Sequence, residues 1–303
     1  MSPILSRSAT QYGGRPPAAI ELTSEGVLAA ALPGKHEPPV YAFEPLRPGI
    51  LVPGISELNM SSPEAVSLAI RNALASVSPR TRSVTVVIPD TAVRVFVLDF
   101  DSLPARASEA IPVLRFRLRK MVPFDVEHAG LSYQILSESK TEARVLVAIL
   151  PSNILEEYET VVRAAGYEPG AVMPSALAAL ATLESSAPLL AACLSKVAIT
   201  TSITRGDDLL LYRTLDLPED SEQRLLEVQR SVAVAAAYYE DKVSVLPKEL
   251  YFAGNGTATE FEHWFGPSEL RIIDFAPRPS TGVATSMSNM SVAGLAGALA
   301  GAV

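Results

Sequence analysis

The stretch SVTVVIPDTAVRVFVLDFDSLPARASEAIPVLRFRLRKMVPF, residues 83–124, decides the fold because two apolar segments run directly into a basic amphipathic helix. β-Branched and aromatic residues predict strands over 83–90 and 92–100. Pro89 and Asp90 mark a break between these segments, which favours two strands over one long strand.

A helix is predicted over 106–120, because apolar residues recur there at spacings of three and four. Its buried stripe is predicted to hold Ile111, Leu114, Leu118 and Met121. Pro123 is expected to end the helix, since proline has no backbone N–H to donate. Arginine and lysine on the remaining faces are typical of a solvated surface. The alternative is a surface that meets acidic phospholipid head groups or an acidic partner.

The rest of the chain alternates predicted strands and helices, which is typical of an α/β protein. Strands are predicted over 18–32 as a hairpin, 131–136, 143–150, 166–173, 189–215 as a meander, 249–256 and 270–275. Helices are predicted over 61–75, 151–165, 174–184, 221–242 and 258–266. The helices over 106–120 and 151–165 are both expected to cover the small sheet that forms between them. Residues 1–17 are expected to be a flexible lead-in, and 276–291 a linker.

Composition excludes several classes of protein. The 303 residues are 48% hydrophobic and 19% charged, which indicates a globular chain of about two domains. A net charge of −8 argues against a nucleic-acid partner. The single cysteine, Cys193, leaves no disulfide framework. The N-terminus lacks the apolar core of a signal peptide and no segment is long enough to span a bilayer, so we expect a cytoplasmic protein.

Four segments resemble the PilM family, the actin-like cytoplasmic proteins of type IV pilus assembly. They are LDFDSLPARASEAIPVLRFRLRKMVPFDVEHAGLSYQIL (98–136), RVLVAILPSNILEEYETVVRAAGYEP (144–169), PSALAALATL (174–183) and LLEVQRSVAVAAAYYED (225–241). They occur in the family's order over most of the chain. The resemblance therefore implies a two-domain, actin-like (ribonuclease H-like) α/β fold.

The resemblance also implies a domain organisation. Domain 1 would comprise residues 1–90, 166–186 and 276–303. An inserted α+β subdomain would occupy 91–165, and a reduced domain 2 would occupy 187–275.

An actin-like fold implies an ATP and magnesium site between two hairpins, and the chain departs from that pattern. In the first hairpin Glu21 keeps an acid, and Ser24 lies in the turn. However, Thr23 replaces the glycine that lets a backbone approach phosphate, and Leu28 replaces the usual lysine. The second hairpin, within 190–206, contains no aspartate or glutamate to orient magnesium.

A third part of the family's nucleotide site is only partly matched. The turn Gly254-Asn255-Gly256 resembles the glycine turn on the adenosine side. The helices that contact the purine in the family are missing before residue 221. We therefore expect a degenerate nucleotide site and no ATP hydrolysis, with ATP and magnesium binding left open.

Catalytic and metal-binding patterns are lacking in the sequence. The three histidines, His36, His128 and His263, have no partners at metal-ligand or triad spacing. No nucleophile-elbow, zinc-protease or P-loop motif is present. We expect no catalytic residues and no metal site, and hence a protein that is not an enzyme.

The resemblance implies a scaffold that binds the N-terminal cytoplasmic tail of a PilN-like inner-membrane protein. The expected place is the inner face of the inner membrane, with the assembly ATPase of the pilus machine as a second candidate partner. A groove between domain 1 and the inserted subdomain would receive the tail, and Arg94, Phe96 and Leu98 are the predicted wall residues. One alternative is a GspL-like component of type II secretion. Another is an actin-like ATP-binding or polymerising ATPase.

Overall fold

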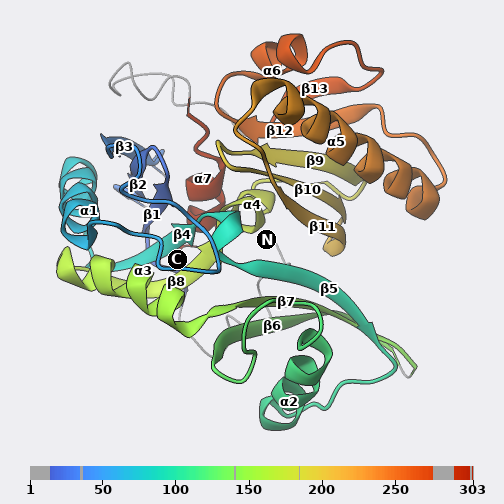
Figure 1. The fold of residues 1–303 in the computed structure, drawn as a ribbon, viewed down its shortest axis with the longest axis horizontal. Helices are drawn as coiled ribbons and strands as arrows, with labels where there is room; N and C mark the ends of the chain where they lie inside the picture. Colours follow the sequence, from blue (N-terminus) through green and yellow to red (C-terminus); the bar gives the residue numbers. More distant parts are fainter. Residues whose placement is uncertain are drawn as a thin grey trace.

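A computed structural model describes residues 14–34, 37–139, 141–183, 185–275, 290–300 and 302. The predicted lead-in at 1–17 and linker at 276–291 fall largely outside the described residues, as does His36. The described residues form three β-sheets with helices packed on them, and Figure 1 shows these as three lobes around the centre.

The first sheet has the strand order β3-β2-β1-β4-β8. The strands are β1 (Ala18–Thr23), β2 (Gly26–Ala31), β3 (Val40–Pro45), β4 (Ser83–Ile88) and β8 (Glu168–Pro174). β2 pairs antiparallel with both β1 and β3, whereas β4 pairs parallel with β1 and with β8. The hairpin predicted over 18–32 is confirmed. β3, in the proline-rich segment, lies at the edge, where proline disrupts no ladder on its outer side.

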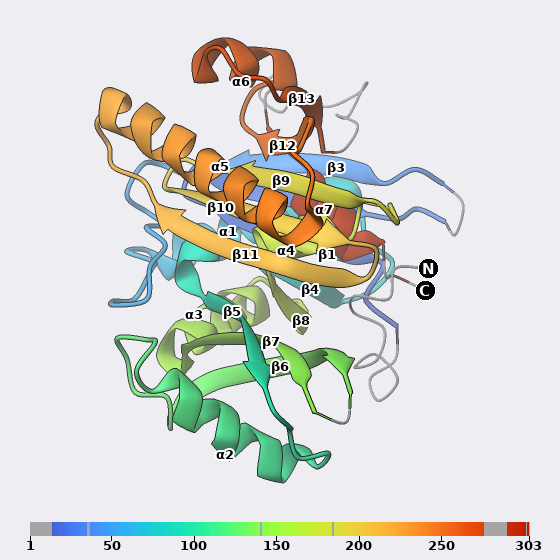
Figure 2. The same ribbon diagram turned by 90° about the vertical axis from the view of Figure 1, so that its right-hand side faces the viewer.

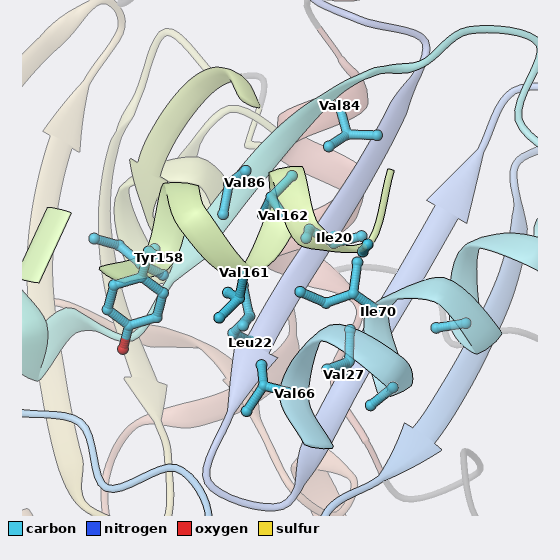
Figure 3. Packing of buried hydrophobic residues seen from close by; sticks show 14 of the residues in the cluster. Ile20, Leu22, Val27, Val66, Ile70, Val84, Val86, Tyr158, Val161 and Val162 are labelled. Atoms are coloured by element: carbon cyan, nitrogen blue, oxygen red, sulfur yellow. The ribbon is translucent and has the colours of Figure 1, made fainter. Parts of the chain in front are cut away.

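Helices cover both faces of the first sheet. α1 (Pro63–Val77) and α3 (Ser152–Ala164) pack on one face, and α4 (Ser175–Leu180) and α7 (Ala293–Leu299) pack on the other. Figure 3 shows the first of these cores, where Ile70 of α1 and Val161 of α3 meet Ile20 of β1. α1 begins as predicted, with the Ser62 side chain as N-cap and proline at the first helical position.

The second sheet repeats the arrangement of the first, with the order β11-β10-β9-β12-β13. Its elements are β9 (Pro188–Leu194), β10 (Ala198–Arg205), β11 (Asp208–Asp216), α5 (Ser221–Val243), β12 (Glu249–Gly254), α6 (Ala258–Phe265) and β13 (Arg271–Asp274). Three antiparallel strands are again followed by two parallel ones. α5 and α6 pack against this sheet and bury Val228, Val232 and Phe261. The two sheets are therefore two copies of one topology.

The third sheet is inserted between β4 and β8, after the short 3-10 turn η2 (Asp90–Ala92). It has the order β5-β7-β6, with β5 (Arg94–Phe100), β6 (Ala129–Glu138), β7 (Ala143–Pro151) and helix α2 (Ala107–Leu118). β4 and β5 are separate strands, as Pro89-Asp90 predicted, and they belong to different sheets.

The predicted stripe of α2 is partly wrong. The helix ends at Leu118, and its buried residues are Ala110, Leu114 and Leu118. Met121 is 41% exposed. The chain turns after Leu118, and Val122 and Val126 then return to the core and fill the place predicted for Met121.

The prediction that two helices cover the third sheet holds only in part, because α3 packs on the first sheet as well as on β6 and β7. Its buried residues Tyr158, Val161 and Val162 lie in the core under the first sheet, next to α1. Only α2 covers the core of the third sheet, and Figure 2 shows it on the outer side of β6 and β7. α3 is therefore shared between the two sheets rather than dedicated to the small one.

Gly297 on α7 is a position where a side chain would not fit. A Cβ atom there would lie 1.8 Å from the carbonyl oxygen of Ala178 in α4, so α7 docks only because this residue lacks a side chain. We expect Gly297→Ala to lower the free energy of unfolding by about 1–3 kcal/mol, the usual cost of overpacking. Urea unfolding of the full chain measures this.

Gly54→Ala is the matched control, because a Cβ at Gly54 would meet nothing within 4 Å. Equal stability of the Gly297 and Gly54 variants would show that α7 does not dock as described.

Candidate functional site

A cavity of about 90 Å³, here called the cleft, lies between the first and second sheets. It is lined by β1, the turn after β1 and the end of β4 from the first sheet, and by the ends of β9 and β12 from the second. The structure brings together five of the predicted nucleotide-site residues here: Glu21, Thr23, Ser24, Gly254 and Asn255. Gly256 belongs to the same turn but does not line the cleft.

Glu21 on β1 is the most unusual side chain in the cleft, because it is a carboxyl group at only 7% exposure. Ser175 donates a hydrogen bond to its Oε1, whereas its Oε2 has no hydrogen-bond partner. A Cβ at Gly294 of α7 would lie 2.7 Å from Oε2, so the closing helix seals this carboxyl group. Burial raises the pKa of Glu21 to about 7, and the nearby charge of Asp90 adds to this, against the bond from Ser175.

Asp90 supplies a second carboxyl group to the cleft. The Tyr212 hydroxyl donates to its Oδ1 at 2.6 Å, and the backbone N–H of Ala176 donates at 3.2 Å. Burial raises its pKa to about 6, although both of these hydrogen bonds act in the opposite direction. Because Tyr212 lies on β11, this contact joins the second sheet to the end of the first.

Sequence reasoning missed Asp90, Ser175, Tyr212 and Gly294. Asp90 was interpreted only as a break in the chain, although a polar residue at the carboxyl end of a parallel strand is where α/β proteins place ligand-binding groups. That signal could have found it. Nothing in the sequence indicates that Tyr212, 122 positions away, contacts it.

In the turn between β1 and β2, backbone N–H groups donate hydrogen bonds to a side chain of the same turn. The backbone N–H groups of Glu25 and Gly26 both donate to the Thr23 hydroxyl, at 3.2 and 3.1 Å. Asn255 donates to the Glu25 carboxylate at 2.9 Å, which joins the two turns that flank the cleft. In a phosphate-binding hairpin these backbone donors would point at the ligand.

The residues present do not fit magnesium and ATP. Ser175 donates to Oε1 of Glu21 and Tyr212 donates to Oδ1 of Asp90, so one oxygen of each carboxyl group already has a partner inside the protein. Across the described ranges, no group of three or more histidine, cysteine or acidic residues could hold a metal ion.

A second concavity of about 600 Å³, here called the groove, lies where all three sheets approach one another. The loop from Val52 to Leu58 forms one wall. Thr91, Arg94 and Pro123 contribute from the inserted segment, and Val197, Asp216 and Leu217 from the second sheet.

The loop that forms this wall is fixed by α3. The Glu157 carboxylate accepts hydrogen bonds from the backbone N–H groups of Asn59 and Met60, at 2.7 and 2.9 Å. The Tyr158 hydroxyl donates to Asn59 Oδ1 at 2.9 Å. Glu157 of α3 therefore holds the loop that forms one wall of the groove.

Of the three predicted wall residues, only Arg94 lines the groove; it lies 3.9 Å from the Asp216 carboxylate. Leu98 is buried in the core under α2, and Phe96 packs against that core. Val95 and Val97, on the opposite face of β5, pack toward the second sheet and α4. Both faces of β5 are therefore covered, and the predicted division into one core face and one groove face does not hold.

The two sheets of repeated topology with a cleft between them define an actin-like, two-domain α/β fold, as predicted. The structure is similar to a solved PilM–PilN type IV pilus biogenesis complex, with a TM-score of 0.73 and 17% identity over 93% of this chain and 97% of that chain. The chain therefore has a PilM-like fold.

A second similar structure is the cytoplasmic domain of EpsL, an inner-membrane component of the type II secretion system of Vibrio cholerae. The TM-score is 0.51 and the identity 13%, over 87% of this chain and 89% of that one. No protein-family model and no curated protein matches the sequence. None of the helices in the described part of the chain has the length and hydropathy needed to cross a membrane.

The raised pKa of Glu21 predicts a pH-dependent stability. Its pKa rises from 4.5 to about 7 on folding, so the folded state keeps a proton that the unfolded chain loses between these values. The free energy of unfolding should therefore fall as pH rises through this window. We expect Glu21→Gln to add on the order of 3 kcal/mol at about pH 8 and to flatten the dependence.

Urea unfolding between about pH 5 and 8 measures this effect, with the exposed Glu142→Gln as control. Some pH dependence from Asp90 should persist in the Glu21 variant. The same pH profile for wild type and Glu21→Gln would show that Glu21 ionises normally.

Proposed function

We propose that the chain is a cytoplasmic scaffold of type IV pilus assembly. In this proposal it works at the inner face of the inner membrane and binds the N-terminal tail of a PilN-like membrane protein in the groove. It binds and positions a partner, and it is not an enzyme. The likeness to a PilM–PilN complex supports a PilN-like partner.

The groove is the observation that carries this proposal. Val52 and Leu58, two of the most exposed large apolar side chains in the described residues, are 62% and 61% exposed and both line it. Exposed apolar side chains that gather at one concavity mark an interaction site. An extended peptide binds such a site through a few apolar anchors.

The charges of the groove favour the tail of a membrane protein. Glu57, Arg94 and Asp216 line it, and because Arg94 lies 3.9 Å from Asp216, Glu57 is the acid that remains for a basic residue of the tail. Cytoplasmic segments next to membrane spans carry an excess of lysine and arginine. A short tail with apolar anchors and basic residues therefore complements this groove.

Two alternatives have less support. A role in type II secretion rests on the lower structural similarity, with a TM-score of 0.51 against 0.73. A polymerising ATPase requires a nucleotide site, whereas the backbone N–H groups of the first turn donate to the Thr23 hydroxyl. The assembly ATPase of the pilus machine is a further partner that we propose on the resemblance alone.

A substitution at Leu58 tests whether the tail peptide binds in the groove. Leu58→Ala should weaken binding of the synthetic tail peptide of the neighbouring PilN-like protein at least tenfold, because it removes an apolar anchor contact worth about 1.4 kcal/mol. Fluorescence titration of labelled peptide measures the affinity, beside a melting curve that checks folding. Leu246→Ala is the matched control, since Leu246 is equally exposed at 61% but does not line the groove. Equal affinity of all three proteins would remove the groove as the site.

Adding magnesium and ATP distinguishes the proposed scaffold from the alternative of an ATP-binding ATPase. We expect no rise in melting temperature with magnesium and ATP, because the backbone donors of the first turn bond to Thr23. A ligand present at a hundred times its dissociation constant would add about 2.7 kcal/mol to the free energy of unfolding, which a thermal shift detects readily. A clear magnesium-dependent rise would contradict the proposed role.

A further inference from the structure

Helix α2 exposes an apolar residue on the side opposite its core. Phe116 is 75% exposed, the highest value among the large apolar side chains of the described residues. Val113 lies three positions before Phe116 and four before Arg117, which places these three on one side of the helix, and Lys120 follows in the turn after the helix ends at Leu118. We call these four residues the outer face of α2.

The positive charges of the outer face are available to a partner. On the other flank, Arg119 pairs with Glu127 at 2.8 Å, and Arg115 donates to the carbonyl of Ala129. Arg117 and Lys120 make no ion pair among the described residues. The acid nearest this face along the helix, Glu109, lies 3.6 Å from Arg106. The outer face is thus locally basic on a chain with a net charge of −8.

Helix α2 lies at the outside of the molecule, and the segment after it leads to the groove. Figures 1 and 2 show α2 as the outermost layer of the inserted sheet, remote from α5 and α6. The chain that leaves its C-terminal end reaches the groove at Pro123. A groove that holds a short tail of a membrane protein must lie near the bilayer, and so must the segment that joins α2 to it at Pro123.

We propose that the outer face of α2 lies on an anionic phospholipid surface. Phe116 enters the interface between head groups and acyl chains, while Arg117 and Lys120 contact anionic head groups, as in interfacial amphipathic helices. The orientation rests on the proposed function, since the tail in the groove sets which side faces the membrane. The charge and exposure of the outer face do not depend on it.

A lipid surface fits this face better than an acidic protein does. A specific protein interface buries about 800 Å² on each partner and draws on roughly 20–30 residues. The outer face supplies only four side chains, and it is flanked by the internally paired Arg119 and Glu127. Weak membrane contact is sufficient here, because a bound tail raises the effective concentration of the face at the bilayer.

Vesicle sedimentation of the full chain tests this. Phosphatidylglycerol–phosphatidylcholine vesicles are compared with pure phosphatidylcholine at about 0.1 M salt, where charges beyond about 10 Å are screened. Arg117→Gln/Lys120→Gln should weaken partitioning onto the anionic vesicles about thirtyfold. Phe116→Ala should weaken it about tenfold. Leu226→Ala/Arg230→Gln on the exposed side of α5 should leave it unchanged.

The vesicles carry no tail peptide, and the peptide titration contains no lipid, so either proposal can fail alone. Partitioning that requires phosphatidylglycerol and is lost in the outer-face variants supports the proposal. Equal partitioning of wild type and variants overturns it, as does binding without phosphatidylglycerol. Loss of an acidic protein partner by the same variants, without vesicle binding by wild type, would assign the face to that protein and also overturn it.

Discussion

The structure depends on the six residues from Pro89 to Arg94, because the three sheets meet there. Asp90 accepts a hydrogen bond from Tyr212 of the second sheet, and the Thr91 hydroxyl donates to the carbonyl of Pro53 in the groove loop. Arg94 begins the inserted sheet and lies beside Asp216. Pro89 and Asp90 line the cleft, whereas Thr91 and Arg94 line the groove. One short segment therefore fixes the positions of both concavities.

The polar groups that line the cleft are mostly hydrogen-bonded to one another. The backbone donors after β1 bond to Thr23, Tyr212 bonds to Asp90, and Ser175 bonds to Glu21. Each bond is made inside the protein, so the two halves are joined without a ligand. Glu21 keeps one oxygen without a donor, which costs stability once it ionises.

Local patterns in the sequence predicted most of the fold, since they specify their own elements. The Ser62 cap, the 18–32 hairpin and the break at Pro89 need no distant partner. Long-range packing could not be predicted in this way. Alternation along β5 separates Phe96 from Val97, but it does not say that α2 covers one and the second sheet the other. Glu157 likewise fixes a loop 98 positions away, which helix periodicity cannot indicate.

The cleft and the groove share a wall, and this bears on how a scaffold of this fold responds to a partner. Pro53 and Val197 line both concavities, one from the loop between β3 and α1 and the other from the turn between β9 and β10. A peptide in the groove would therefore contact the loop, the inserted segment and the second sheet together. Binding energy shared among the three would oppose their separation.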